Sequence, residues 1–171
     1  MGKRKILLFL CFLAVFLVAS FVVVPISPVG RYQALYAEDI SQPTEEIIIA
    51  TLINNVRNAN GVENLCYNET LAQIADIRAK DMIERNYFGH YTPEKTTVFN
   101  LMNDWGIKAK YRGENLAISN PPDYVTPEKV VNAWMESGNH KLNLLRKVYR
   151  NIGVGIEVRG EEKIVVLLFT N

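Results

Sequence analysis

The sequence predicts an α+β domain in which helices are layered against antiparallel strands, preceded by an apolar N-terminal segment. Three observations support this prediction: an apolar run from Ile6 to Val24, helical apolar repeats that follow residue 44, and an alternating pattern that begins at Ile152. Helices combined with an antiparallel hairpin are typical of α+β domains. The length of 171 residues suits one domain with a short extension.

The N-terminal segment has the features of a targeting sequence. The basic cluster Lys3–Lys5 precedes the apolar run, and Pro25 closes it. Positive charge before an apolar run keeps that end in the cytoplasm and directs the following chain across the membrane. The run is longer than the ~7–15 residues of a signal peptide and close to the ~18 that a spanning helix needs. Residues 1–26 are therefore predicted to be a signal peptide or a membrane anchor, and the protein to be secreted or membrane-anchored outside the cytoplasm.

The composition changes after Pro25, and residues 27–43 are predicted to be a linker, with the folded domain at 44–171. Thr44 is a plausible N-cap of a first helix that ends near Gly61. A second helix begins at Asn68 and has the clearest apolar face in the chain, and a shorter helical pattern runs from 98 to 105. Thr126–Pro127 predicts a further start, with proline at the first helical position.

The C-terminal part predicts a β-hairpin. Apolar residues alternate from Ile152 to Val158, polar residues 159–162 form a turn, and residues 164–169 are continuously apolar. Alternation indicates a half-buried strand, whereas a continuous run indicates a strand buried on both faces.

The charge of the chain argues against a nucleic-acid-binding protein, and its cysteine content argues against a disulfide-stabilised domain. The 19 basic and 18 acidic residues give a net charge of +1, which does not supply the field that nucleic-acid binding requires. Cys11 lies in the apolar run, so the exported part has Cys66 as its single thiol and no internal disulfide. Cys66, between Leu65 and Tyr67, is predicted to be a buried structural side chain.

The two histidines of the chain, His90 and His140, both follow helical patterns and are predicted to lie in turns. Glu114 follows a glycine and precedes apolar residues, so its carboxylate is expected to be partly buried and to need a partner. Two imidazoles and a carboxylate can form a divalent metal site of the kind that zinc uses, with an open position. Two unrelated surface histidines are the alternative interpretation. Ser119 and Ser137 lack the Gly-x-Ser-x-Gly pattern, so a serine hydrolase is not expected.

Several motifs in register resemble those of the CAP superfamily, which comprises cysteine-rich secretory proteins, antigen 5 and pathogenesis-related proteins. The motifs are Phe88–His90, Gly113–Ala117, Trp134–Leu145 and Asn151–Gly155. The resemblance extends from about Leu52 to Asn171. The chain is similar to a compact prokaryotic member, because it lacks the disulfide cysteines of eukaryotic relatives.

The resemblance implies a three-layer α-β-α sandwich with a surface cleft, in which two histidines and one or two acids face each other and often hold zinc. His90, Glu114 and His140 match the metal positions of this cleft. Glu94 is the nearest candidate for the second acid, and a solvated loop acid is the alternative. The expected cofactor is thus zinc or another divalent metal, and no catalytic residue is assigned.

Fold resemblance does not define the chemistry, so two hypotheses follow. In the first, the domain is a binding module that recognises an envelope component, a lipid or another protein, and it contacts the membrane through its N-terminal segment. In the second, it is a zinc-dependent hydrolase or peptidase in which Glu114 is a third ligand or activates a bound water.

Overall fold

The structure is a computed structural model and describes residues 42–171. The predicted signal or anchor at 1–26 and nearly all of the predicted linker lie outside the described residues. Within residues 42–171, no helix has the length and apolar character needed to cross a membrane.

Helices and strands are mixed along the described chain, as predicted. The helices are α2 (Glu45–Ala59), α3 (Glu69–Glu84), α4 (Val98–Asp104), the 3-10 helix η1 (Pro122–Tyr124), α5 (Pro127–Glu136) and α6 (Gly138–Leu144). The strands are β1 (Cys66–Tyr67), β2 (Arg112–Ser119), β3 (Asn151–Arg159) and β4 (Glu162–Thr170). They form one sheet in the order β1-β3-β4-β2, in which β1 is parallel to β3 and the other pairs are antiparallel.

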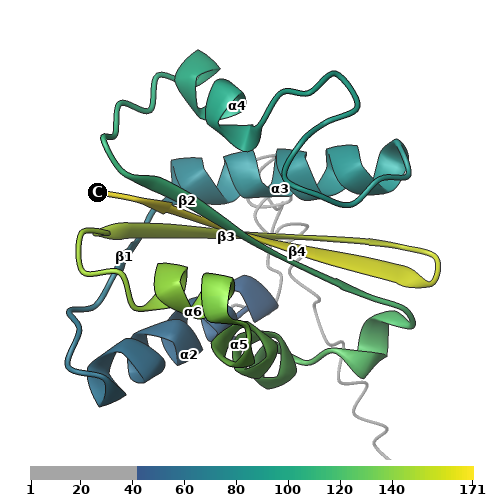
Figure 1. Cartoon of the computed structure of the whole chain (residues 1–171). Helices are drawn as coiled ribbons and strands as arrows, with labels where there is room; N and C mark the ends of the chain where they lie inside the picture. Colours follow the sequence, from purple (N-terminus) through teal and green to yellow (C-terminus); the bar gives the residue numbers. More distant parts are fainter. Residues whose placement is uncertain (1–41) are drawn as a thin grey trace, which may run out of the picture. The chain divides into compact units, whose positions relative to one another are not determined.

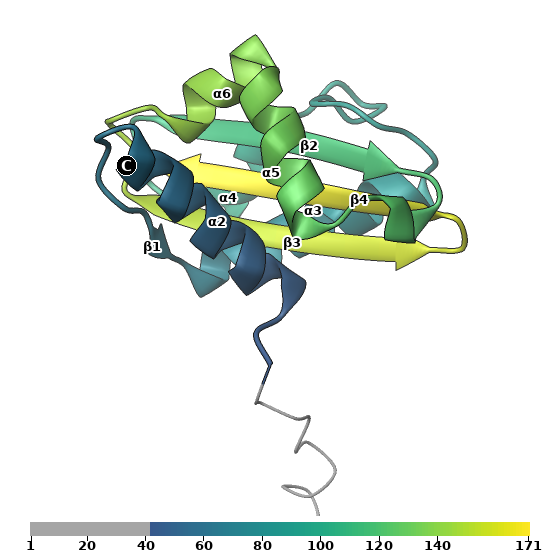
Figure 2. The same ribbon diagram turned by 90° about the horizontal axis from the view of Figure 1, so that it is seen from below.

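The sheet lies between two layers of helices (Figure 1). Helices α3 and α4 cover one face, and α2, α5 and α6 cover the other. Figure 2 shows the molecule with α2, α5 and α6 in front of the sheet. This is the α-β-α layering that the sequence resemblance implied.

Two of the predicted helix starts are confirmed by side-chain caps, whereas Thr44 precedes α2 without a side-chain cap bond. The side chain of Asn68 accepts a hydrogen bond from the backbone N–H of Leu71 at 3.0 Å, which satisfies an orphan donor in the first turn of α3. At α5, Thr126 Oγ1 accepts from the N–H of Lys129 at 3.4 Å, and Pro127 occupies the first turn, where its missing N–H costs nothing.

Strand β4 is buried on both faces, as its continuous apolar run predicted. Val165, Leu167 and Phe169 belong to the core beneath α2 and α5. Ile164, Val166 and Leu168 belong to the core beneath α3 and α4. A central strand thus supplies both cores, and alternation fixes which residue enters which.

Two glycines of β3 allow helix α3 to pack directly on the sheet. A Cβ at Gly153 would lie 2.4 Å from the backbone of Leu71 and Ala72, and one at Gly155 would lie 2.2 Å from the backbone N of Asp76. Neither distance is compatible with a side chain, so the Gly-x-Gly pattern sets the separation of α3 from the sheet.

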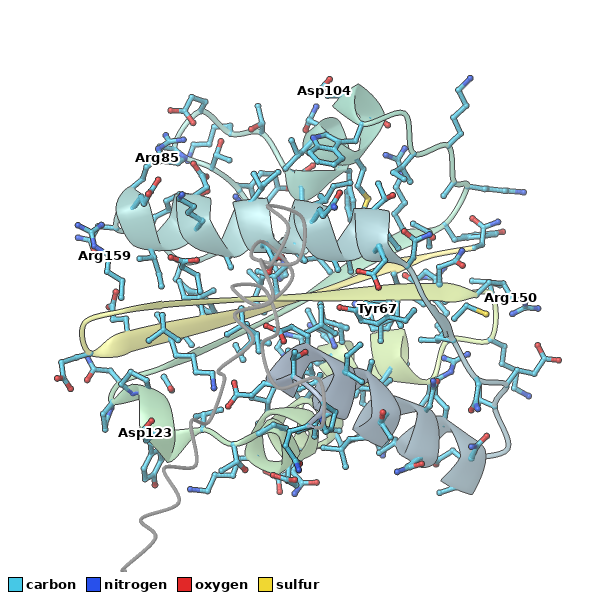
Figure 3. The ribbon with its side chains drawn as sticks, turned by 180° about the vertical axis from the view of Figure 1, so that it is seen from behind. Tyr67, Arg85, Asp104, Asp123, Arg150 and Arg159 are labelled. Atoms are coloured by element: carbon cyan, nitrogen blue, oxygen red, sulfur yellow. The ribbon has the colours of Figure 1, made fainter. Side chains whose placement is uncertain are left out.

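Cys66 is exposed, so the prediction of a buried structural thiol was wrong. It lies in β1, a two-residue strand at the sheet edge, where side chains alternate between the two sides. Leu65 is buried and Tyr67 is half-buried, which leaves Cys66 facing outward. Figure 3 shows Tyr67 and the neighbouring Arg150 at this end of the sheet.

Candidate functional site

The candidate site is built around β2, the edge strand opposite β1, which the sequence patterns did not predict as a strand. Alternate residues of β2 contact different helical layers. Glu114 bonds to a side chain of α3, whereas Asn115 bonds to the backbone of α6. Residues from both layers therefore meet along one strand.

Glu114 is the centre of this arrangement. Its side chain is buried, with the residue only 7% exposed, and both carboxylate oxygens are engaged. Oε1 accepts a hydrogen bond from Arg78 Nε at 3.3 Å, and Oε2 lies 2.6 Å from His90 Nδ1. The expectation of a partly buried carboxylate with a partner is confirmed.

Arg78 is a site residue that the sequence reasoning missed. It is 3% exposed, and besides its bond to Glu114 it donates from Nη2 to the carbonyl of Gly89 at 2.6 Å. Arg78 thus ties the loop before His90 to the carboxylate that His90 contacts. A signal for it exists in the sequence, because Arg78 is a charged residue on the otherwise apolar face of α3, between Ile74 and Met82.

Tyr87 supports Arg78 from the other side. Arg78 Nη1 donates to the Tyr87 hydroxyl, which in turn donates to Asp81. The guanidinium carbon also lies 5.4 Å from the centre of the Tyr87 ring, a cation–π distance. A buried arginine with this many partners holds a fixed position.

His90 lies in the turn-like loop after α3, as predicted, but His140 does not lie in a turn. It belongs to α6, which begins immediately after α5 because Ser137 ends one helix and begins the next. Gly138 and Asn139, which suggested a turn, instead form the first residues of α6. Asn115 Nδ2 donates to the carbonyl of His140 at 3.1 Å and links this helix to β2.

Side chains from the α5–α6 layer also bind alternate carbonyls of β2. Trp134 Nε1 donates to Leu116 at 3.0 Å, Asn143 Nδ2 to Glu114 at 3.3 Å, and the Tyr149 hydroxyl to Arg112 at 3.0 Å. These bonds cover backbone groups that an edge strand would otherwise leave open. They also fix the position of α6, and with it His140, relative to Glu114.

The two histidines have pKa values shifted in opposite directions. The hydrogen bond to Glu114 raises the pKa of His90 above its usual value of 6.5. Burial, followed by repulsion from His90, lowers the pKa of His140 below 6.5. His140 is therefore favoured in the neutral form that metals bind, and the contact at Nδ1 of His90 leaves Nε2 as its available nitrogen.

A cavity of about 270 Å³ opens beside these groups, and its lining includes His90, Glu114, Asn143 and Tyr149. Gly113 shapes its floor, because a Cβ there would lie 2.5 Å from the Tyr149 hydroxyl. His140 itself is one helical turn before Asn143.

Glu94 lies apart from these groups. It forms an ion pair with Arg85 and is 61% exposed at its side chain, and it lines a different cavity of about 330 Å³ with Arg85 and Asp81. Figure 3 shows Arg85 at the C-terminal end of α3, on the outside. Among residues 42–171, no group of three His, Cys, Asp or Glu side chains is arranged to hold a metal ion. The metal site at His90, Glu114 and His140 stays a prediction.

Comparison with known proteins gives consistent matches. Two relatives occur in Bacillus subtilis: YkwD is 38% identical over 107 residues, which is 63% of this chain and 40% of YkwD. The uncharacterized membrane protein YlbC is 29% identical over 116 residues, 68% of this chain and 32% of YlbC. The chain therefore spans less than half the length of either relative.

Among solved structures, an extracellular protein containing an SCP domain from Bacillus anthracis has a TM-score of 0.66 at 23% identity, covering 86% of this chain and 45% of that one. This likeness concerns the fold. A sequence model of the cysteine-rich secretory protein family, CAP, matches residues 50–169. That range includes β2, both histidines and the β3–β4 hairpin, and the chain therefore belongs to the CAP family.

Proposed function

We propose that this protein is an extracytoplasmic binding module of the cell envelope, whose cleft holds a divalent metal ion through His90 and His140. The observation that supports the metal most directly is the contact between His90 Nδ1 and Glu114 Oε2. A carboxylate that accepts from one imidazole nitrogen orients the other toward a metal, which is the usual arrangement around metal-binding histidines.

In this proposal Glu114 orients His90, and Arg78 orients Glu114. Both oxygens of Glu114 already have partners in Arg78 and His90. When a metal is bound, it supplies a fixed positive charge that links the loop of His90 to helix α6.

The same contacts favour binding over hydrolysis. A catalytic zinc has three protein ligands and an open position, and a base close to the bound water. Here the carboxylate that would be the third ligand or the base is buried between an arginine and an imidazole. The ion would then have two protein ligands, His90 and His140, and such a site exchanges its metal readily. The cleft around the ion would bind a partner, such as an envelope component, a lipid or a protein.

Location at the cell envelope is supported by the basic cluster and apolar run at residues 3–24. The names of two compared proteins agree with it, since one is called a membrane protein and the other extracellular.

Calorimetric titration of the full chain with zinc, in a neutral detergent because of the apolar run, tests the proposal. We expect one ion per chain, and no hydrolysis of peptide, ester or phosphodiester substrates with or without zinc. Turnover that requires stoichiometric zinc would replace the binding module with the hydrolase, and absence of zinc binding would remove the metal.

A further inference from the structure

The cavity beside His90 contains two arginines, Arg112 and Arg146, that form no ion pair with any residue in the range 42–171. Within the cavity lining that the structure describes, Glu114 is the one carboxylate, and it is already bound to Arg78 and His90. The cavity therefore has an excess of positive charge on a concave surface, where charges of one sign attract a ligand of the opposite sign.

Arg112 is held in place by only part of its guanidinium. Nη1 donates to Asn103 Oδ1 at 2.7 Å and to the carbonyl of Phe99 at 3.0 Å, which ties β2 to α4. Within residues 42–171, Nε and Nη2 of Arg112 form no hydrogen bond. The guanidinium carbon lies 5.8 Å from the centre of the Phe99 ring. Arg112 thus has a fixed orientation and unused donors.

Arg146 is fixed by aromatic rings instead of carboxylates. Its guanidinium carbon lies 5.5 Å from the ring centre of Tyr111 and 5.6 Å from that of Tyr149. Tyr149 is fully buried and stacks on Phe169 with ring centres 5.0 Å apart, so this support is rigid. Cation–π contacts hold an arginine without neutralising its charge, which leaves its donors available to an anion.

Part of the lining offers aromatic surface, beside the polar side chains of Thr97 and Asn143. Phe99 and Tyr91 line the same cavity as the two arginines, and Tyr91 is largely exposed. The volume of about 270 Å³ accommodates a small group. A ligand with an oxyanion at one end and a ring or short apolar group at the other matches both parts of the lining.

We propose that Arg112 and Arg146 form an oxyanion subsite of the cleft, which binds the carboxylate or phosphate group of a small ring-bearing ligand. Planar guanidinium groups bind both kinds of oxyanion through paired N–H donors. The subsite lies in the cleft of the proposed metal site, but it uses different side chains and does not require the metal. Its failure is therefore distinguishable from failure of the metal proposal.

The test uses the full chain in neutral detergent with EDTA present, and the probes are phenyl phosphate, phenylacetate, inorganic phosphate and the neutral 2-phenylethanol. Binding is followed by the side-chain Nε–H resonances of the arginines in NMR titrations. Arg146→Gln removes a cavity guanidinium that donates no hydrogen bond to the backbone of residues 42–171, so the backbone bonds at this position are kept. Lys147→Gln is the matched control, because it removes the same charge from the next, exposed residue, which does not line the cavity.

We expect a ring-bearing oxyanion to bind more tightly than inorganic phosphate, and 2-phenylethanol not to shift the arginine resonances. Arg146→Gln should lower the affinity about 10-fold or more, because a charge-assisted hydrogen bond is lost, while Lys147→Gln leaves it within about 2-fold. Arg112→Gln should act like Arg146→Gln. Whichever probe binds more tightly, phenyl phosphate or phenylacetate, assigns the headgroup. Equal losses in Arg146→Gln and Lys147→Gln, or no binding of either ring-bearing anion, would overturn the subsite.

Discussion

Glu114 shows how one buried side chain determines the behaviour of its neighbours. Because it contacts Nδ1 of His90, it favours the protonated imidazole. The pKa of His140, which has no such carboxylate acceptor among residues 42–171, is instead lowered by burial and by the nearby charge of His90. Sequence reasoning singled out His90 and His140 because histidines were scarce, and it expected Glu114 to be buried with a partner, which the contact with His90 confirms. It did not identify Arg78, because a single charge on an apolar helix face does not by itself reveal its partner.

The opposite pKa shifts give the first prediction. NMR titration of the imidazole Cε1–H signals should give two midpoints, with His90 above 6.5 and His140 below it. Glu114→Gln keeps the shape of the side chain and removes its charge, so the His90 midpoint should fall toward ~6.5. His90 and His140 titrating together near that value would show that the His90–Glu114 contact and the burial of His140 are both absent in solution.

The same shifts have linked effects on stability, and their signs differ. A raised pKa means that the folded state binds the proton more tightly, so the His90–Glu114 contact stabilises the fold at low pH and this contribution is lost as pH rises through the folded pKa. The lowered pKa of His140 acts in the other direction, and its contribution is present above ~6.5 and is lost as pH falls. The difference in unfolding free energy between wild type and Glu114→Gln should therefore become smaller as pH rises above the His90 midpoint.

At the scale of elements, the helices with strong apolar periodicity and cap residues were predictable, whereas β2 was not. The segment Arg112–Ser119 contains a glycine, an acid and an asparagine, and these residues are suited to the site and not to an isolated strand. Its strand conformation comes from pairing along its whole length with β4. Helix α6 was missed for a related reason, since glycine and asparagine suggested a turn that the packing against β2 overrides.

The close contact between α3 and β3 gives a second prediction. Gly155→Ala should lower the unfolding free energy by about 1–3 kcal/mol or more, because the new methyl group would lie 2.2 Å from backbone and α3 must move. Gly138→Ala is the control, since nothing lies within 4 Å of a Cβ there. Denaturant melts of both variants measure the difference. Equal stability of the two variants would mean that the helix and sheet are farther apart than described.

Movement of α3 should also reach the site, because Arg78 lies on that helix. In Gly155→Ala the His90 midpoint should therefore change, although residue 155 does not contact His90. An unchanged midpoint in a destabilised variant would show that the Arg78–Glu114–His90 contacts do not depend on the helix position.

At the scale of the whole molecule, the layered fold and the two-sided burial of β4 could be predicted from motifs and periodicity. The exposure of Cys66 could not, because it depends on which side of a two-residue edge strand faces the core. Export depends on the N-terminal residues and on the secretion machinery of the cell. It stays a prediction based on the basic cluster and the apolar run.

Topology in cells gives the third prediction. Protease added to intact cells, stripped of their wall, should digest the domain at 44–171, because the charge before the apolar run directs it outward. A cytoplasmic marker protein, resistant until lysis, is the control. Protection of the domain until the cells are lysed would place it in the cytoplasm and contradict the envelope role.

The central claim is that His90 and His140 act as one metal site although fifty positions separate them. The most direct measurement is a double-mutant cycle of zinc affinity by calorimetry on wild type, His90→Ala, His140→Ala and the double variant. Loss of outer-shell partners already costs ~10–100-fold in metal affinity, so each single variant should lose on the order of 100-fold, and the double variant should lose little more. Additive losses, or wild-type affinity in the double variant, would contradict the shared site.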